Sequence, residues 1–215
     1  AKHLLQDFPE VTKYTSKPTA LFSNTQIENP NLMLEGMPNY RSGVDGLRVS
    51  NSTKGGITFA ASTTQNGIHM ITVVLGVEAV DGDPYARFVA TSSLMNYVVR
   101  TFVSSIVVKE GDPYGKSKAT IMDGKSETVL AVAKKDFYIV EKQGSQAEPK
   151  IQFKSTQESF KAPVKSGTTL GKLHYTDPDK IGRGYLEDQE PTVDMVAGRT
   201  IEKSFFLKVW WNEFV

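Results

Sequence analysis

The sequence predicts an α+β protein with two unlike parts, and three observations lead to this prediction. Residues 44–77 contain three strand-like runs, and a helical pattern follows them. After residue 102, short alternating runs are separated by Gly-Asp-Pro, Asp-Gly and Asp-Pro turn signals at intervals of about ten residues, a spacing typical of a small all-β sandwich or barrel. The last twelve residues are rich in aromatic side chains at helical spacing.

These patterns divide the chain into three expected segments. Residues 1–102 mix helices with strands, residues 103–203 form an all-β domain, and residues 204–215 begin an amphipathic helix. The texture of the sequence changes near residues 102–105, where we place the domain boundary. The chain shows no internal repeat of 20–50 residues.

Residues 1–14 have a helical pattern that Pro9 interrupts, since proline is favoured as the first residue of a new helix. The turn signals "SKPT", "NPN" and "MPN" predict an irregular surface segment over residues 15–43. The expected buried stripe of the first helix consists of His3, Leu4, Leu5 and Phe8.

Strands are expected at 44–50, 57–64 and 68–77, and the Asn-Gly signal in "QNG" predicts a hairpin between the last two. A helix is expected over residues 84–101, with Asp83 as its cap and Pro84 as its first residue. Four side chains recur on the face that should pack on the sheet: Phe88, Met95, Val99 and Phe102.

The six strand-like runs of the all-β part are "SSIVVKEG", "ETVLAVA", "DFYIVEK", "KIQFKS", "GKLHYTD" and "PTVDMVAG".

Composition and charge exclude several classes of protein. The 215 residues carry a formal net charge of +1, and neither half is basic, which argues against nucleic-acid binding. Cysteine is absent, so the chain forms no disulfide and no thiolate metal site. His3, His69 and His174 lack acidic residues at ligand spacing, so we expect neither a metal nor a cofactor. His69 belongs to an apolar strand face, where a histidine usually has a structural role.

The segment "YRSGVDGLRVSNSTKGG" at residues 40–56 contains the order Gly-Val-Asp-Gly-Leu followed by a cation, Arg48, and it leads into a strand hairpin and a helix. This order resembles the third motif of the penicillin-recognising serine enzymes, where a strand carries Lys-Thr-Gly along the active site. The wider match includes "MLEGMPNYRSGVDGL", "ITVVLGVEAVDGDPYARFVATSSLMNYV", "DGKSETVLAVA", "IGRGYLEDQEPTVDMVA" and "IEKSFFLKVWWNEFV". Over essentially the whole chain, the sequence is similar to the low-molecular-mass penicillin-binding proteins of streptococci and their relatives, which are D-alanyl-D-alanine carboxypeptidases.

The resemblance implies a transpeptidase-like α/β domain, of which residues 1–102 are the C-terminal part, followed by an all-β domain and a membrane-anchoring helix. It also implies an enzyme that removes the terminal D-alanine of peptidoglycan stem peptides through a serine acyl-enzyme and is acylated by β-lactams. The expected location is the extracellular face of the cytoplasmic membrane of a Gram-positive-like bacterium. The N-terminal half of the catalytic domain is a further expected partner.

The chain departs from the family pattern at the catalytic motifs. It contains no Ser-x-x-Lys and no Ser-x-Asn, so no catalytic residue is assigned within it. Arg48, Val49 and Ser50 stand where the family has Lys-Thr-Gly. Arg48 keeps the charge that binds a carboxylate but cannot lose its proton. Asp45 and Gly46 would support this strand, although Asp45 is also a common turn residue.

Two alternatives remain open. In the final segment, Phe206, Val209, Trp210 and Phe214 share one helical face, which suits either a membrane surface or closure of the β-domain core. For the whole chain, one reading is the substrate-side part of a carboxypeptidase, and the other is a catalytically inactive cell-wall-binding or spacer module.

Overall fold

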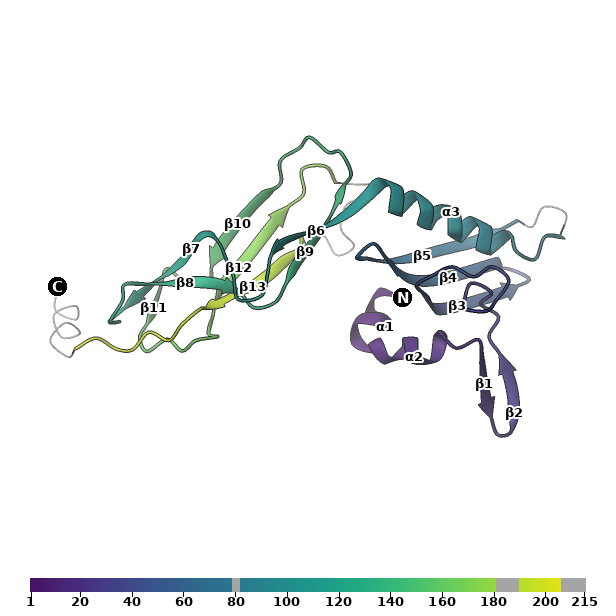
Figure 1. Cartoon of the computed structure of the whole chain (residues 1–215), viewed down its shortest axis with the longest axis horizontal. Helices are drawn as coiled ribbons and strands as arrows, with labels where there is room; N and C mark the ends of the chain where they lie inside the picture. Colours follow the sequence, from purple (N-terminus) through teal and green to yellow (C-terminus); the bar gives the residue numbers. More distant parts are fainter. Residues whose placement is uncertain (79–81, 181–189, 206–215) are drawn as a thin grey trace. The chain divides into compact units, whose positions relative to one another are not determined.

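The computed structural model of the chain describes residues 1–78, 82–180 and 190–205, and it is mostly β-strand with few helices (Figure 1). The chain forms two compact units, the first from Ala1 to Ser104 and the second beginning at Ser105. Each unit has its own hydrophobic core. We therefore describe the units separately.

The first unit is built on an antiparallel sheet in the order β3-β4-β5. The turn between β4 and β5 places Asn66 and Gly67 at φ values of 51° and 73°, which is the geometry that an Asn-Gly hairpin favours. The elements of this unit are α1 (Lys2–Asp7), η1 (Pro9–Val11), α2 (Thr12–Thr15), β1 (Thr19–Phe22), β2 (Thr25–Glu28), β3 (Val44–Ser52), β4 (Gly56–Gln65), β5 (Ile68–Val77) and α3 (Ala86–Thr101).

Helix α3 lies along one face of this sheet, and α1 and α2 lie on the other side (Figure 1). Phe88 of α3 meets Phe59 of β4 edge to face, with ring centroids 5.4 Å apart. Such a pair adds about 0.5–1.5 kcal/mol beyond the area it buries. The core under α3 contains Phe59, Ala61, Ile68, Met70, Val74, Phe88 and Met95.

The opposite face of the sheet is less covered. Strand alternation places Arg48, Ala60 and Val73 on this face, because they pair across β3, β4 and β5. Val73 is 50% exposed and Leu75 is 74% exposed. This face of β5 therefore presents large apolar side chains to solvent.

The structure corrects two predictions for residues 1–43. The buried stripe of the first helix is wrong, since Leu5 is buried whereas His3, Leu4 and Phe8 are exposed. The short helix buries one side chain, because α1 has only six residues. Residues 15–43 are also not wholly irregular, because they contain the antiparallel β1–β2 hairpin.

The β1–β2 hairpin turns through Ser23 and Asn24, at φ values of 46° and 64°. Serine seldom adopts this conformation, so Ser23 and Asn24 do not form the Asn-Gly pattern that predicts a hairpin.

The third helix begins slightly later than predicted, at Ala86, while its end at Thr101 agrees. Asp83 Oδ1 accepts a hydrogen bond from the Tyr85 amide, so Asp83 caps the turn that precedes the helix. Val99 and Phe102 are only partly buried, and two polar residues, Arg87 and Thr91, take buried positions beside Phe88 and Met95.

The second unit contains a six-stranded sheet in the order β10-β12-β13-β8-β7-β11 and a two-stranded sheet of β6 and β9. All its pairings are antiparallel within the large sheet except that of β11 with β7. The strands are β6 (Phe102–Val108), β7 (Pro113–Met122), β8 (Thr128–Ala133), β9 (Phe137–Lys142), β10 (Lys150–Ser155), β11 (Ser159–Lys161), β12 (Thr169–Thr176) and β13 (Thr192–Ala197).

Alternating residues of the large sheet point into a core that also includes Phe137 and Ile139 of β9. Leu173 of β12 and Met195 of β13 are fully buried within it. The all-β prediction for this region is confirmed, but β7 and β11 were missed. β7 begins at Pro113 and contains a glycine, both of which disfavour a strand, and β11 has only three residues.

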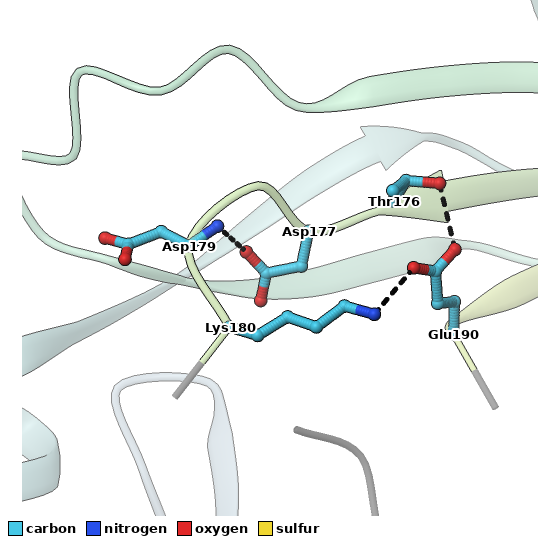
Figure 2. Close-up of polar contacts among 5 residues, drawn as sticks. All are labelled: Thr176, Asp177, Asp179, Lys180 and Glu190. Carbon is cyan, nitrogen blue, oxygen red and sulfur yellow. Dashed lines mark hydrogen bonds and ion pairs between the residues drawn. The ribbon is translucent and has the colours of Figure 1, made fainter. Parts of the chain in front are cut away.

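A polar cluster lies at the end of β12 and before β13 (Figure 2). Glu190 accepts a hydrogen bond from the Thr176 hydroxyl over 2.9 Å and pairs with Lys180 Nζ over 3.0 Å. Asp177 Oδ1 accepts a bond from the Asp179 amide over 2.9 Å. These contacts fix the two chain segments on either side of residues 181–189.

The predicted anchor residues Phe206, Val209, Trp210 and Phe214 lie outside the described residues. Among the residues that are described, no helix combines the length and apolar character that crossing a membrane requires.

Candidate substrate-binding cleft

A cleft of about 290 Å³ lies beside β3, which forms the edge of its sheet in the described structure. β3 contributes Leu47, Arg48 and Val49, and α2 and the β1–β2 hairpin supply the other walls. The lining residues from those walls and their connections are Tyr14, Thr15, Lys17, Thr19, Ala20, Ile27, Glu28, Asn29 and Pro30.

Arg48 and Val49 face this cleft differently. The Arg48 side chain is exposed and makes no hydrogen bond or ion pair with any described residue. Val49 is half-buried and packs against the core of the first unit, so it helps to hold the strand. Ser50 is exposed and does not line the cleft. Of the predicted triplet, the structure therefore brings the first two residues to the cleft.

Asp45 and Gly46 connect β3 to α2. The Thr15 hydroxyl donates a hydrogen bond to the Asp45 carbonyl oxygen over 2.7 Å. A Cβ atom on Gly46 would lie 2.5 Å from Thr15 Oγ1, closer than real Cβ contacts allow. Gly46 thus permits α2 to reach the strand. Asp45 Oδ1 is buried without a hydrogen-bond partner in the described part of the chain.

Two asparagines support the cleft through hydrogen bonds to the backbone around it. The side-chain amide nitrogen of Asn29 donates to the carbonyl oxygens of Thr15 and Lys17, at 3.0 and 3.1 Å. The buried Asn31 side chain donates to the Gly46 carbonyl oxygen over 3.4 Å and accepts from the Met33 amide over 3.0 Å. In the sequence, "NPN" predicts only a turn. The hydrogen bonds of these asparagines could not be predicted from it, because their partners are up to 15 residues away along the chain.

Arg87 secures the far end of β3 from helix α3. Its guanidinium donates to the carbonyl oxygens of Ser50 and Thr58, at 3.1 and 3.3 Å, and to Asn51 Oδ1. Burial lowers the pKa of the Arg87 guanidinium from its ordinary value. The sequence alone does not indicate this role for Arg87, because a charged side chain is not expected on a buried helix face.

The charges of the cleft suit a carboxylate. Lys17 and Arg48 place two cations among its lining residues, against the single carboxylate of Glu28. A guanidinium can hold a carboxylate through two parallel hydrogen bonds. The hydroxyl of Thr15 is already donated to Asp45, so it is not poised as a nucleophile. The cleft can bind an anionic group, but its own residues provide no reacting hydroxyl with an adjacent base.

A serine and a histidine do meet elsewhere on the sheet. Ser62 Oγ and His69 Nε2 are 3.1 Å apart, yet Ser62 is fully buried in the sheet and neither residue lines the cleft. The pair satisfies the polar atoms of facing strands. Within residues 1–78, 82–180 and 190–205, no group of three His, Asp or Glu residues is placed to hold a metal ion.

The comparisons with known proteins agree on one family. Residues 102–203 match the family described as "Penicillin-binding protein 5, C-terminal domain". The chain is 26% identical over 174 residues to D-alanyl-D-alanine carboxypeptidase DacA of Haemophilus influenzae, covering 80% of this chain and 42% of that protein. It is 24% identical over 209 residues to D-alanyl-D-alanine carboxypeptidase DacC of Escherichia coli, covering 97% of this chain and 48% of that protein.

Solved structures give the same result. A crystal structure of a peptidoglycan synthesis regulatory factor (PBP3) from Streptococcus pneumoniae has a TM-score of 0.89 and 42% identity, and the match covers 94% of this chain and 55% of that one. Penicillin-binding protein 5 of Haemophilus influenzae, at 23% identity and a TM-score of 0.64, shares the fold over 94% of this chain and 54% of its own. The chain spans about half the length of the relatives it matches. Residues 102–203 therefore belong to the penicillin-binding protein 5 C-terminal domain family, and the chain as a whole is similar to penicillin-binding proteins and D-alanyl-D-alanine carboxypeptidases.

Proposed function

We propose that this chain supplies the substrate-side edge of a serine-type D-alanyl-D-alanine carboxypeptidase. The observation that carries the proposal is the position of Arg48, an exposed cation on an edge strand that lines a cleft. The substrate would be a peptidoglycan stem peptide, whose terminal D-alanine carries a free carboxylate. Arg48 would hold that carboxylate, and β-lactams would enter the same site.

The chemistry divides between this chain and residues outside it. The reacting serine and its lysine would come from elsewhere, because the sequence holds no Ser-x-x-Lys or Ser-x-Asn. Arg48 would orient the peptide end without relaying a proton, since a guanidinium stays protonated. Val49 offers no hydroxyl, and losing one hydrogen bond to a charged group costs about 1.5–3 kcal/mol. We therefore expect weaker carboxylate binding than with Lys-Thr-Gly.

The finer architecture is part of the same proposal. Residues 1–102 would be the C-terminal part of a transpeptidase-like domain, and the exposed Val73 and Leu75 fit a sheet face that packs on a further part of that domain. Residues 204–215 would begin a helix that lies on the membrane through Phe206, Val209, Trp210 and Phe214. This arrangement would hold the enzyme on the extracellular face of the cytoplasmic membrane of a Gram-positive-like bacterium.

A second function is favoured by one specific observation. Arg48, Val49 and Ser50 all differ from the family triplet, and the two other catalytic motifs are absent from the sequence. A catalytically inactive module that binds the cell wall or acts as a spacer would show the same departures. Such a module would keep the cleft without its chemistry.

Two measurements test these functions. Incubation of the purified 215-residue chain with a fluorescent penicillin should give no covalent label, because no acylated serine is assigned within it. A labelled band at the mass of the chain would contradict the proposed division of the catalytic residues.

Binding of a peptide ending in D-Ala-D-Ala, followed by NMR, should shift the amide signals of Leu47, Arg48 and Val49. Arg48→Met should abolish these shifts, whereas Lys54→Met, at another cation of the same hairpin, should preserve them. If both variants bind the peptide equally well, Arg48 is not part of the binding site. Binding that is unchanged when the terminal carboxylate is amidated would favour the module that recognises some other part of the cell wall.

A further inference from the structure

The outer face of the six-stranded sheet carries an unusual row of cations. Leu173 and Met195 point into the core, so their neighbours on β12 and β13 point outward. Lys172 pairs in register with Lys154 on one side and Asp194 on the other, which sets these three side chains side by side. Lys134 Nζ lies 3.9 Å from Asp194 Oδ2 and extends the row.

Two hollows lie on this outer face. The first, of about 520 Å³, is lined by Lys134, Lys135, Lys172, Thr192, Val193 and Asp194. The second, of about 400 Å³, is lined by Gly111, Pro113, Lys118, Ser126, Thr128, Leu130, Val132, Gly198 and Arg199. Val196 of β13 pairs with Val132 of β8, so the strands that carry the two hollows are neighbours and both hollows open on the same side of the sheet.

The cations of this outer face are poorly neutralised. Lys118, Lys135, Lys154, Lys172 and Arg199 have no ion-pair partner within 4.0 Å among the described residues. Asp194 forms an ion pair with Lys134. Glu190, farther along the face, forms an ion pair with Lys180. Like charges that face each other across strands, as Lys154 and Lys172 do, are destabilising. Asp194 lies in register beside Lys172 and also pairs with Lys134, so one carboxylate accompanies three lysines in this part of the described sheet.

We propose that the outer face of the six-stranded sheet binds a linear polymer with repeating phosphate groups. Phosphate fits these cations, because lysine ammonium groups bind phosphate as point charges and the Arg199 guanidinium can hold a phosphate through two hydrogen bonds. The hydroxyls of Thr128 and Thr192 add hydrogen-bond donors in the hollows, whereas the Ser126 hydroxyl already donates to the Thr128 carbonyl oxygen over 2.9 Å.

The shape of the face favours one kind of phosphate-bearing partner, a flexible polymer, over a membrane or a nucleic acid. Two separate hollows suit a flexible chain that places successive phosphates in each, rather than a flat bilayer. None of the residues that line the two hollows is aromatic, so the hollows offer no platform for stacking nucleic-acid bases. This site is independent of the proposed carboxypeptidase role of the first unit.

The test measures binding of the 215-residue chain to fluorescently labelled long-chain inorganic polyphosphate by anisotropy. Binding should weaken with salt. A plot of the logarithm of the association constant against the logarithm of the salt concentration should have a slope of about −3 to −4, if five cations each release about 0.7 counterion. The paired variants Lys154→Gln/Lys172→Gln and Lys118→Gln/Arg199→Gln should each lose about tenfold or more in affinity, and the slope should become shallower by about 1.4.

The matched control is Lys13→Gln/Lys142→Gln, which removes two exposed lysines located on α2 and β9. Its affinity should stay within about twofold of the wild type, since these residues are not on the face. An equal loss of affinity in the control variant would show that binding depends only on the net charge of the protein, and it would overturn the proposed site.

Two competitors separate a polymer from other sources of phosphate. Pyrophosphate should displace the labelled polymer only weakly, and equal potency per phosphate would mean that the site binds single anions. Vesicles of equal phosphatidylglycerol and phosphatidylcholine should bind more weakly than polyphosphate. Stronger vesicle binding that depends on Lys172 would assign the face to a membrane surface and overturn the polymer proposal.

Discussion

The Arg87 guanidinium donates a hydrogen bond to the Ser50 carbonyl oxygen over 3.1 Å, which ties helix α3 to the strand that borders the cleft. Arg87 is only 5% exposed as a residue, and its guanidinium also donates to Asn51 and the Thr58 carbonyl oxygen. A single side chain therefore joins the helix to two strands.

Arg87→Met should destabilise the first unit by about 2–4 kcal/mol, because it removes several hydrogen bonds to a buried charged group and leaves their acceptors unpaired. Urea unfolding followed by far-UV circular dichroism measures the change. Arg100→Met, at an exposed arginine of the same helix, should stay within about 0.5 kcal/mol of the wild type. Similar losses in both variants would show that Arg87 has no special role.

The exposed apolar face of β5 should promote self-association of the purified chain, since large adjoining apolar patches are seldom left in water. Val73→Thr/Leu75→Lys should therefore shift the sedimentation-velocity profile toward monomer. The comparison variant Val140→Thr/Leu130→Lys makes the same changes at exposed strand positions of the second unit. If the comparison variant restores monomer equally well, the association does not arise from β5.

The second unit should unfold independently, because its core includes Leu173 and Met195 and is separate from that of the first unit. Limited proteolysis should degrade residues 1–100 before residues 103–200. Leu173→Ala should cost about 2–5 kcal/mol and speed digestion of the second unit alone. Phe88→Ala, in the other core, should speed digestion of the first unit alone. Earlier loss of residues 103–200 in the wild type would contradict this independence.

The polar cluster of Figure 2 predicts a pH effect with a defined sign. The hydrogen bond from Lys180, followed by that from Thr176, holds the pKa of Glu190 below its ordinary value of 4.5. A carboxyl whose pKa falls on folding stabilises the fold above its ordinary pKa, and this contribution disappears as pH drops through the lowered value.

Lys180→Met should raise the pKa of Glu190 toward 4.5, as measured by carbon NMR titration of its carboxyl group. Lys165→Met, at an exposed lysine between β11 and β12, serves as the control and should leave the titration unchanged. An unshifted titration in Lys180→Met would mean that the ion pair in Figure 2 does not persist in solution.

Local chemistry was enough to predict some elements closely. β5 was expected at 68–77 and extends from Ile68 to Val77, because its apolar run begins directly after an Asn-Gly turn. The β1–β2 hairpin and β7 were missed for the opposite reason. The hairpin turns at Ser23 and β7 begins at Pro113, and the local preferences of these two residues do not favour the conformations that the folded chain imposes.

By itself, the sequence determined the resemblance to penicillin-binding proteins, the change from a mixed part to an all-β part near residue 102, and the strand that carries Arg48. These properties follow from periodicity, turn residues and the order of motifs, all of which depend on residues that are close together along the chain. Only the tertiary structure decided that Asn31, Gly46 and Arg87 hold that strand in place, and that Lys154 and Lys172 lie side by side. Such contacts join residues distant in sequence, and their energies depend on burial and register that exist only after the chain has folded.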